Sequence, residues 1–338
     1  MIISNQQNPE YLHLQMCAKE ERRGARRAVG LSGWLVLGSM ALMIVVQQAL
    51  YLLLDFAGAL DGDNSTLLEY LVSCIGYLFL ALIPMAFIVS NEYPAEEFLP
   101  FGKPKQVGLG GIDVLLLCSV GMMLTLAANW PTALVQHLLQ MVGLSGTVPD
   151  MPLDQSAGTQ VFYLVYGTVI PPLVEEILFR GAVLGCLRRW GDGFAIAASS
   201  ILFGLYHGNV GQFVFATLVG LVFGYLRVRT GNILPSMLLH MLNNGLAAVA
   251  SLLNQNFGGE TSGMFSTVYF IVVFALALVL LLLRLIRQKK DGFQVFHLAE
   301  RHMASTQAGR MRGLVTSVGS ILMVVYGVVS SISRMVQR

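Results

Sequence analysis

Long apolar segments alternate with short polar gaps along most of the chain. A segment must have about 20 residues to cross a hydrocarbon layer of about 30 Å. Segments of roughly that length lie near residues 30–54, 67–90, 107–128, 161–187, 193–208, 211–227, 232–253 and 264–286. Charged residues are concentrated in the tails and in the gaps between these segments. The pattern predicts an all-α fold, a polytopic transmembrane helical bundle with about eight spans.

Composition supports a membrane protein and argues against nucleic-acid binding. Of the 338 residues, 55% are hydrophobic and 12% are charged, whereas about a quarter of the residues in soluble domains are charged. The net charge of +2 offers no broad basic surface for nucleic acid. The four cysteines are far apart in the sequence, so they indicate neither a disulfide framework nor a cysteine metal site.

Basic residues predict the orientation of the spans. They lie in the amino-terminal tail and in alternate gaps between the spans. Those in the gaps are Lys103, Lys105, Arg188, Arg189, Arg227, Arg229, Arg284, Arg287, Lys289 and Lys290. The intervening loops, 60–66, 129–160, 208–211 and 254–263, contain no Lys or Arg. Because cytoplasmic loops are enriched in these residues, we expect a multi-pass protein of the cell membrane with a cytoplasmic amino terminus.

The same pattern suggests four regions. We expect a cytoplasmic tail at 1–29, two spans and a loop at 30–106, a transmembrane core at 107–286 and a carboxy-terminal tail at 287–338. Within that last tail, Leu314 to Ser333 carries no charge. It fits a ninth span, an interfacial helix or a segment that docks a partner. No internal repeat is evident, which weakens an inverted-repeat transporter interpretation.

A few polar residues lie inside the predicted spans, where an ionisable side chain costs about 2.5–3.5 kcal/mol or more and indicates function. Asp113 lies near the start of the third span, and we expect it to reach water. The others are candidates for chemistry: Glu175, Glu176, Arg180, His207, His240, Asn243 and Asn244.

The fourth span carries the acidic pair. On an ideal helix Glu176 and Arg180 are about 40° apart and can form an ion pair, whereas Glu175 is about 140° from Arg180. Glu175 therefore remains the unpaired carboxylate and the candidate general base. Pro171 and Pro172 precede the pair, and we expect them to bend the helix and open a pocket beside Glu175.

Two other spans repeat the four-residue spacing. His240 and Asn244 share one face of the seventh span, with Asn243 about 60° away as a substitute, and Phe203 and His207 share a face of the fifth span. Counted at 1.5 Å per residue, Glu175 and His240 fall in the inner half of the membrane. His207 falls nearer the outer side, which is a mismatch in depth.

Two chemistries fit these residues. In the first, Glu175, helped by His207, deprotonates a water that attacks a peptide carbonyl, and His240 and Asn244 stabilise the oxyanion. In the second, His207, His240 and Glu175 bind zinc, which activates the water. Asn244 is a poor zinc ligand but a good oxyanion donor, so we favour a reaction without a cofactor. Small residues four apart, Gly181 with Gly185 and Gly220 with Gly224, predict close helix approaches.

Three short motifs resemble those of one protease family. Glu175-Glu176-Ile-Leu-Phe-Arg180, Phe203-Gly-Leu-Tyr-His207 and His240-Met-Leu-Asn-Asn244 are similar to the EExxxR, FxxxH and HxxxN motifs of the CPBP family. This family comprises the CAAX-processing and bacteriocin-processing intramembrane proteases. The resemblance covers roughly residues 107–253, and the motifs occur in the family's order.

The resemblance implies an intramembrane endopeptidase that acts on a peptide or membrane-protein substrate in the lipid bilayer. Carried over by residue, it implies that Glu175 and His207 activate the water and that His240 and Asn244 stabilise the oxyanion. Glu176, Arg180 and Phe203 would then support the site. Two other functions stay open at this point: a proton-coupled transporter, and a non-enzymatic bacteriocin-immunity protein whose working part is the tail.

Overall fold

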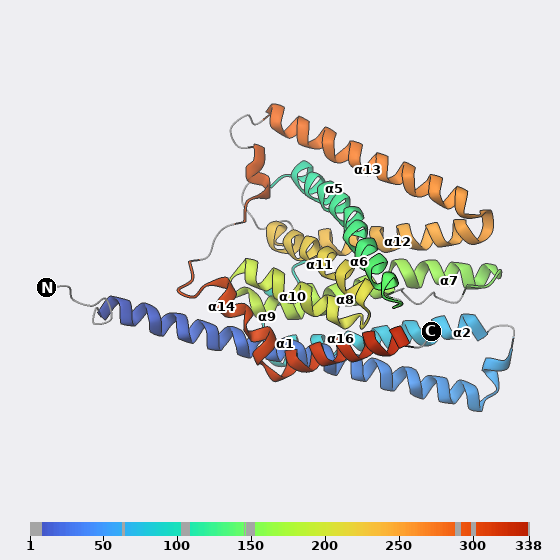
Figure 1. Cartoon of the computed structure of the whole chain (residues 1–338), viewed down its shortest axis with the longest axis horizontal. Helices are drawn as coiled ribbons and strands as arrows, with labels where there is room; N and C mark the ends of the chain where they lie inside the picture. The colour runs from blue at the N-terminus through green and yellow to red at the C-terminus, as the bar shows by residue number, and fades with distance from the viewer. Residues whose placement is uncertain are drawn as a thin grey trace.

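The computed structural model describes residues 9–62, 65–102, 109–144, 146, 153–287, 292–298 and 302–336, and this part of the chain is helical with no strand (Figure 1). Two long helices and several shorter segments form its first half: α1 Pro9–Phe56, η2 Ala59–Asp61, α2 Ser65–Leu80, α3 Leu82–Ser90, α4 Ala95–Phe98, α5 Gly111–Ala127 and α6 Asn129–Met141.

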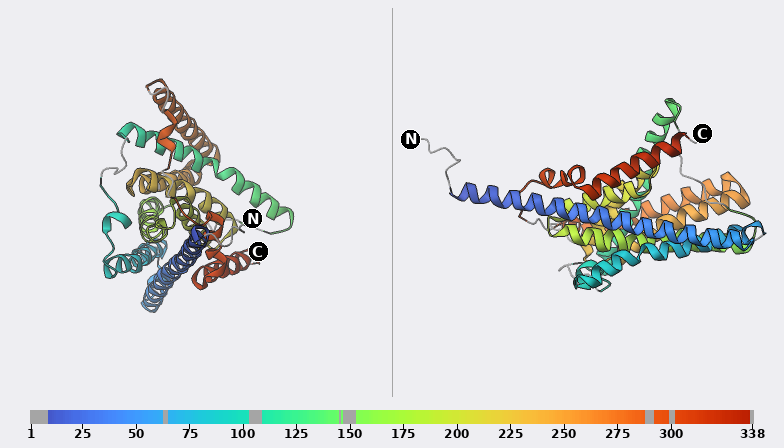
Figure 2. Two further views of the ribbon diagram at one scale, coloured as in Figure 1. Left: turned by 90° about the vertical axis from the view of Figure 1, so that its left-hand side faces the viewer. Right: turned by 90° about the horizontal axis from the view of Figure 1, so that it is seen from below.

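The second half contains the helices that surround the candidate site. They are α7 Ala157–Thr168, α8 Ile170–Glu176, η3 Ile177–Val183, α9 Leu184–Arg188, α10 Asp192–Tyr206, α11 Val210–Thr230, α12 Leu234–Phe257 and α13 Gly259–Arg287. The chain then continues through η4 Gly292–Phe296, α14 Gln307–Met311, α15 Gly313–Thr316 and α16 Val318–Val336. Figure 2 shows most of the helices packed along one long axis, with α1 extending past the others toward the amino terminus.

Eight helices of the described chain are long and apolar enough to cross a membrane, which confirms a polytopic bundle of about eight spans. The set differs from the predicted one at two places. Helix α10 has 15 residues and falls short of a full span, whereas Val318–Met335 in the carboxy-terminal tail qualifies as one. Most residues of α10 are buried against other helices and few of them face lipid. This helix can therefore be shorter than a full span.

The α10–α11 hairpin forms the centre of the bundle. The two helices approach closely at Gly220 and Gly224, as predicted. A Cβ on Gly220 would lie 3.1 Å from the Ser200 Cα, and one on Gly224 would lie 3.3 Å from Ile196. These glycines therefore allow α11 to pack closely on α10. The other predicted pair, Gly181 and Gly185, packs instead against Leu99 and Phe98 at the α4 end.

The tail helix α16 packs on both α1 and α10. Its contact with α1 is made by Gly33 and Gly319, where a Cβ on Gly33 would collide with the Gly319 backbone. The turn between α10 and α11, predicted as an exposed outer loop at 208–211, is covered by this helix. Asn209 is 3% exposed, and a Cβ on Gly208 would meet Tyr326 and Ser330.

Two other local expectations were wrong. Asp113 does not reach water: it is 6% exposed, pairs with Arg284 at 3.1 Å and accepts a hydrogen bond from the Gly110 N–H at the start of α5. The expected loop at 129–160 begins as helix α6. Within the expected tail at 1–29, the chain is helical from Pro9 onward. The basic residues Lys103, Lys105, Lys289 and Lys290 lie outside the described residues.

Candidate active site

A break in the fourth span positions the acidic pair. Helix α7 ends at Thr168 and α8 begins at Ile170, with Pro171 and Pro172 in its first turn. The prolines cannot donate backbone hydrogen bonds, so the helix is interrupted just before them. Pro171 lines a cavity together with Glu175, as the sequence predicted.

The helix changes type immediately after the two glutamates. Residues Ile177–Val183 form a π-helix, a wider turn that occurs frequently at functional sites. The ideal α-helical angles used in the prediction therefore do not hold beyond Glu176. The ion pair survives this change, because Arg180 Nη1 still lies 3.1 Å from Glu176 Oε1.

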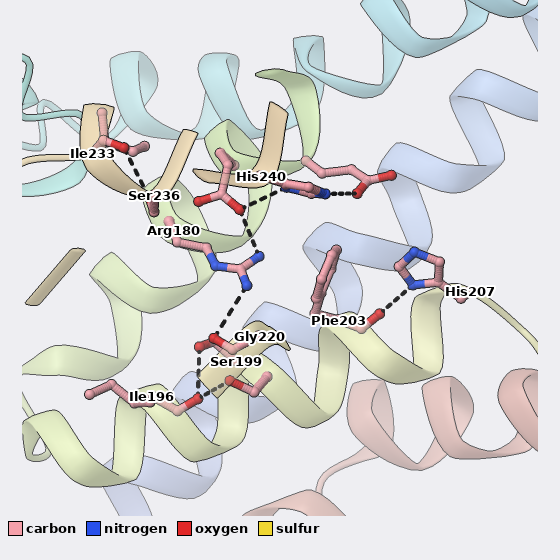
Figure 3. A network of polar contacts seen from close by, with 12 residues as sticks. Arg180, Ile196, Ser199, Phe203, His207, Gly220, Ile233, Ser236 and His240 are labelled. Atoms are coloured by element: carbon pink, nitrogen blue, oxygen red, sulfur yellow. Dashed lines mark hydrogen bonds and ion pairs between the residues drawn. The ribbon is translucent and has the colours of Figure 1, made fainter. Parts of the chain in front are cut away.

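Arg180 is enclosed on all sides. It is 1% exposed, and Nη2 donates a hydrogen bond to the Gly220 carbonyl at 3.3 Å (Figure 3). Its guanidinium also lies over the Phe203 ring, 4.4 Å from the centroid, and 5.2 Å from that of Phe223. Arg180 thus neutralises Glu176 and joins η3 to α10 and α11.

His240 reaches this pair from α12 and lies between the two carboxylates. Its Nδ1 is 3.1 Å from Glu176 Oε1, and its Nε2 is 3.7 Å from Glu175 Oε2. A carboxylate can only accept, so Nδ1–H donates to Glu176 and fixes the ring orientation. Nε2 remains directed toward Glu175, which is 4% exposed.

His207 follows the last residue of α10, and its orientation is fixed by a backbone carbonyl. The Nδ1–H donates to the Phe203 oxygen at 2.9 Å (Figure 3). Because Nδ1 carries the proton in this neutral tautomer, Nε2 presents a lone pair that can accept a proton. The Phe203 ring packs against both imidazoles, with centroid distances of 4.9 Å to His207 and 5.8 Å to His240.

All four predicted catalytic residues, Glu175, His207, His240 and Asn244, line one cavity of about 260 Å³. Its lining on α11 extends from Gln212 to Val219, which is about 10 Å along the helix axis. The depth mismatch does not separate the two histidines, because both imidazoles pack against the Phe203 ring.

Asn243 and Asn244 both line the cavity. The Asn243 Nδ2 donates to the Asn244 Oδ1 at 3.4 Å. This bond occupies the oxygen of Asn244 and leaves its Nδ2–H group as a donor. This bond orients Asn244, and Asn243 stays the alternative donor because it lines the same cavity.

Two tyrosines of the site were not predicted. Tyr77 and Tyr166 line the cavity together with Glu175, and the Tyr77 side chain lies near enough to the Glu175 carboxylate to interact with it. Tyr77 also contacts the hydroxyl of Tyr206. A tyrosine inside the second predicted span was the available signal, but tyrosines in membrane helices also serve as interfacial anchors, so spacing alone did not single it out.

Metal ligation requires three or four ligands around one point. Within the described ranges, no group of three or more His, Cys, Asp or Glu side chains could hold a metal ion. His207, His240 and Glu175, the predicted zinc ligands, thus do not form such a group, and Glu176 is engaged by Arg180 and His240.

Comparison with known proteins shows that the region of this site is similar to a protease family. The family described as Type II CAAX prenyl endopeptidase Rce1-like matches residues 157–246. The chain resembles this family. The matched range contains all seven residues predicted for the site, from Glu175 to Asn244, although it is narrower than the range 107–253 assigned from the motifs.

Two curated proteins are similar over parts of the chain. One, from Bacillus subtilis (strain 168), is named "Putative membrane peptidase YdiL"; it is 23% identical over 52% of this chain and 69% of its own length. The other, from Staphylococcus aureus (strain USA300), is named "Membrane-embedded CAAX protease MroQ"; it is 29% identical over 27% of this chain and 40% of its own length. The chain thus covers less than half of that second relative. No solved structure gives a significant match.

These matches confirm the resemblance to the Rce1-like CAAX proteases. Together with the apolar helices, they indicate a multi-pass membrane protein. They support membrane endopeptidase activity, which is the hydrolysis of peptide bonds.

Proposed function

We propose that the protein is an intramembrane endopeptidase that cleaves peptide bonds with a water activated by Glu175. One observation carries the proposal: four residues from three separate segments, Glu175, His207, His240 and Asn244, line the same buried cavity. Peptide hydrolysis needs a base for the water and donors for the oxyanion. The cavity offers both.

The water is bound between Glu175 and His207 in this proposal. Glu175 takes a proton as the water oxygen attacks the peptide carbonyl, and the lone pair on His207 Nε2 orients the water. Tyr77 holds the carboxylate in place through its hydroxyl. The proton then passes from Glu175 to the departing amine, and the base is regenerated.

The oxyanion is stabilised by Asn244 and His240. Asn244 donates from Nδ2, the group left available by its bond to Asn243. His240 donates from Nε2 in its protonated form, which balances the charge of two carboxylates and one guanidinium at the site. Glu176 and Arg180 support this state by fixing Nδ1.

The metal-independent reaction is part of this proposal, because Arg180 and His240 engage Glu176 and no three His, Cys, Asp or Glu side chains of the described residues are arranged to hold a metal ion. The proposed location is the cell membrane with a cytoplasmic amino terminus. The substrate is a peptide or membrane protein within the bilayer.

A comparison of membrane proteomes tests the activity. Cells carrying the wild type are compared with cells carrying Glu175→Ala, and peptide termini are mapped by mass spectrometry. We expect at least one membrane peptide whose cleaved form is present only with the wild type. Identical terminal peptides in the two strains, at equal protein levels, contradict the proposal.

A further inference from the structure

A second, larger cavity joins the catalytic one. It measures about 970 Å³, near the upper end of the 300–1,000 Å³ typical of ligand pockets. The two cavities share lining residues at their junction: Gly167, Gln212, Phe215, Asn243 and Asn244. This second cavity, here called the side groove, therefore leads directly to the residues of the proposed oxyanion site.

The side groove lies between α6, α7, α12 and α13, on the side of the bundle away from α1 and α16 (Figure 1). Its lining continues along α12 from Asn243 to Ala250 and includes Trp130, which is 71% exposed and suited to the membrane interface. The groove thus runs from the catalytic cavity toward the end of the bundle opposite the amino terminus.

The polar groups of the groove are uncharged: they are carboxamides and the hydroxyls of Thr132, Tyr163, Ser266 and Thr267. Asn129, Gln136, Gln212, Asn243 and Asn244 line it, and its described lining includes no charged side chain. In the described part of the chain, neither Gln136 nor Gln212 has a side-chain hydrogen bond to the protein. Polar groups at membrane depth are costly without a partner.

An extended peptide supplies the partner that these groups lack. A carboxamide donates and accepts, as a peptide backbone does, and a chain unwound for cleavage exposes backbone groups that lipid cannot satisfy. A lipid tail offers no such groups. Asn129 to Gln136 on α6 and Asn243 to Ala250 on α12 each extend about 10 Å, the length of about three residues of extended chain.

We propose that the side groove binds an uncharged, extended segment of about three substrate residues adjoining the cleaved bond. This inference rests on the proposed function. The segment enters between α6 and α12 from the end of the bundle opposite the amino terminus. The groove thereby selects against charge, because a charged residue would have no counter-ion in the described lining and would bind about 100-fold more weakly.

Photocrosslinking with a defined probe tests the groove without requiring cleavage. The probe is a synthetic Leu/Ala transmembrane peptide with a central Gly-Pro break and a benzophenone beside it, reconstituted in phosphatidylcholine vesicles. The full chain carries Glu175→Gln, so that the probe is not cut. We expect crosslinks to map to α6 and α12 residues that line the groove.

Neighbouring residues on α6 provide a matched pair of variants. Ala133 lines the groove, whereas Leu134 is 59% exposed and lies outside that lining. Ala133→Trp should lower the crosslink yield at least tenfold, and Leu134→Trp should leave it within twofold. A Lys in the probe's central segment should weaken binding about 100-fold, and Gln136→Glu should restore much of that loss.

Any one of three results would overturn the inference. Crosslinks could be confined to α1, α10 or α16, the two tryptophan variants could have equal effects, or lipid acyl chains alone could displace the probe. Activity separates it from the proposed function. If the probe crosslinks in the groove but the wild type cleaves no membrane peptide, the groove stands and the proposed function fails. If the wild type cleaves but the probe avoids the groove, only this inference fails.

Discussion

Arg180→Ala gives the sharpest test of how the acidic pair is held. Arg180 and Glu176 are 1% and 0% exposed and lie 3.1 Å apart, so removing the guanidinium leaves a carboxylate in the protein interior. Breaking such a buried pair costs about 3–5 kcal/mol. Loss of the contacts with Phe203 and Phe223 adds about 1 kcal/mol. We therefore expect the free energy of unfolding to fall by about 4–6 kcal/mol.

The double variant Arg180→Ala with Glu176→Gln separates charge from packing. It removes the unpaired carboxylate as well, so we expect it to be more stable than Arg180→Ala alone by about 1–3 kcal/mol. A matched control is Arg188→Ala, because Arg188 and Asp192 are also four residues apart but 28% and 16% exposed. That change should cost at most about 1 kcal/mol.

The assay is unfolding in mixed micelles by titration with sodium dodecyl sulfate, followed by tryptophan fluorescence and circular dichroism. Arg180→Ala should also lower folding yield. If Arg180→Ala costs less than about 1 kcal/mol, or if the double variant is less stable than the single one, the buried ion pair does not have the role assigned to it.

Three further predictions concern packing, metal and orientation. Gly204→Ala should lower the free energy of unfolding by about 1–3 kcal/mol, since its Cβ would lie 2.8 Å from the Phe213 carbonyl oxygen. The control Gly263→Ala, whose Cβ would have nothing within 4 Å, should be neutral in the same unfolding assay. Equal losses in the two variants would contradict this packing. Purified protein freed of metal by a strong chelator, as checked by mass spectrometry, should keep its peptidase activity; activity that is lost and returns with zinc but not magnesium would contradict the proposed reaction. In a cysteine-free background, an impermeant thiol reagent added outside cells should label a cysteine at Asn256 and not at Arg189, and the reverse pattern would invert the orientation.

The sequence predicted the bundle, and it singled out candidate residues that the structure brings to one cavity, for a physical reason. Lipid imposes a minimum length of apolar chain on each crossing, and it makes buried polar residues rare enough to be conspicuous. Glu175, His207, His240 and Asn244 therefore stood out before any contact was known, and they line a single cavity.

The features that were missed depend on contacts between distant segments. The π-helix at Ile177–Val183 follows no sequence spacing, and the contact of Tyr77 with Glu175 joins α2 to α8. The pairing of Asp113 with Arg284 explains why this carboxylate can be buried, yet the partners are on α5 and α13. The covered turn at Asn209 likewise required the position of α16, which one segment's hydropathy cannot provide.

Peptidase activity of Glu175→Gln measures the central claim most directly. The purified full chain is reconstituted in liposomes with the substrate found by the proteome comparison, and the rate of cleavage is compared with that of the wild type. Loss of a general base costs about 10²–10⁴ in rate, so we expect at least a 100-fold loss, with the free energy of unfolding within about 1 kcal/mol of the wild type. Activity of Glu175→Gln within tenfold of the wild type would contradict the account.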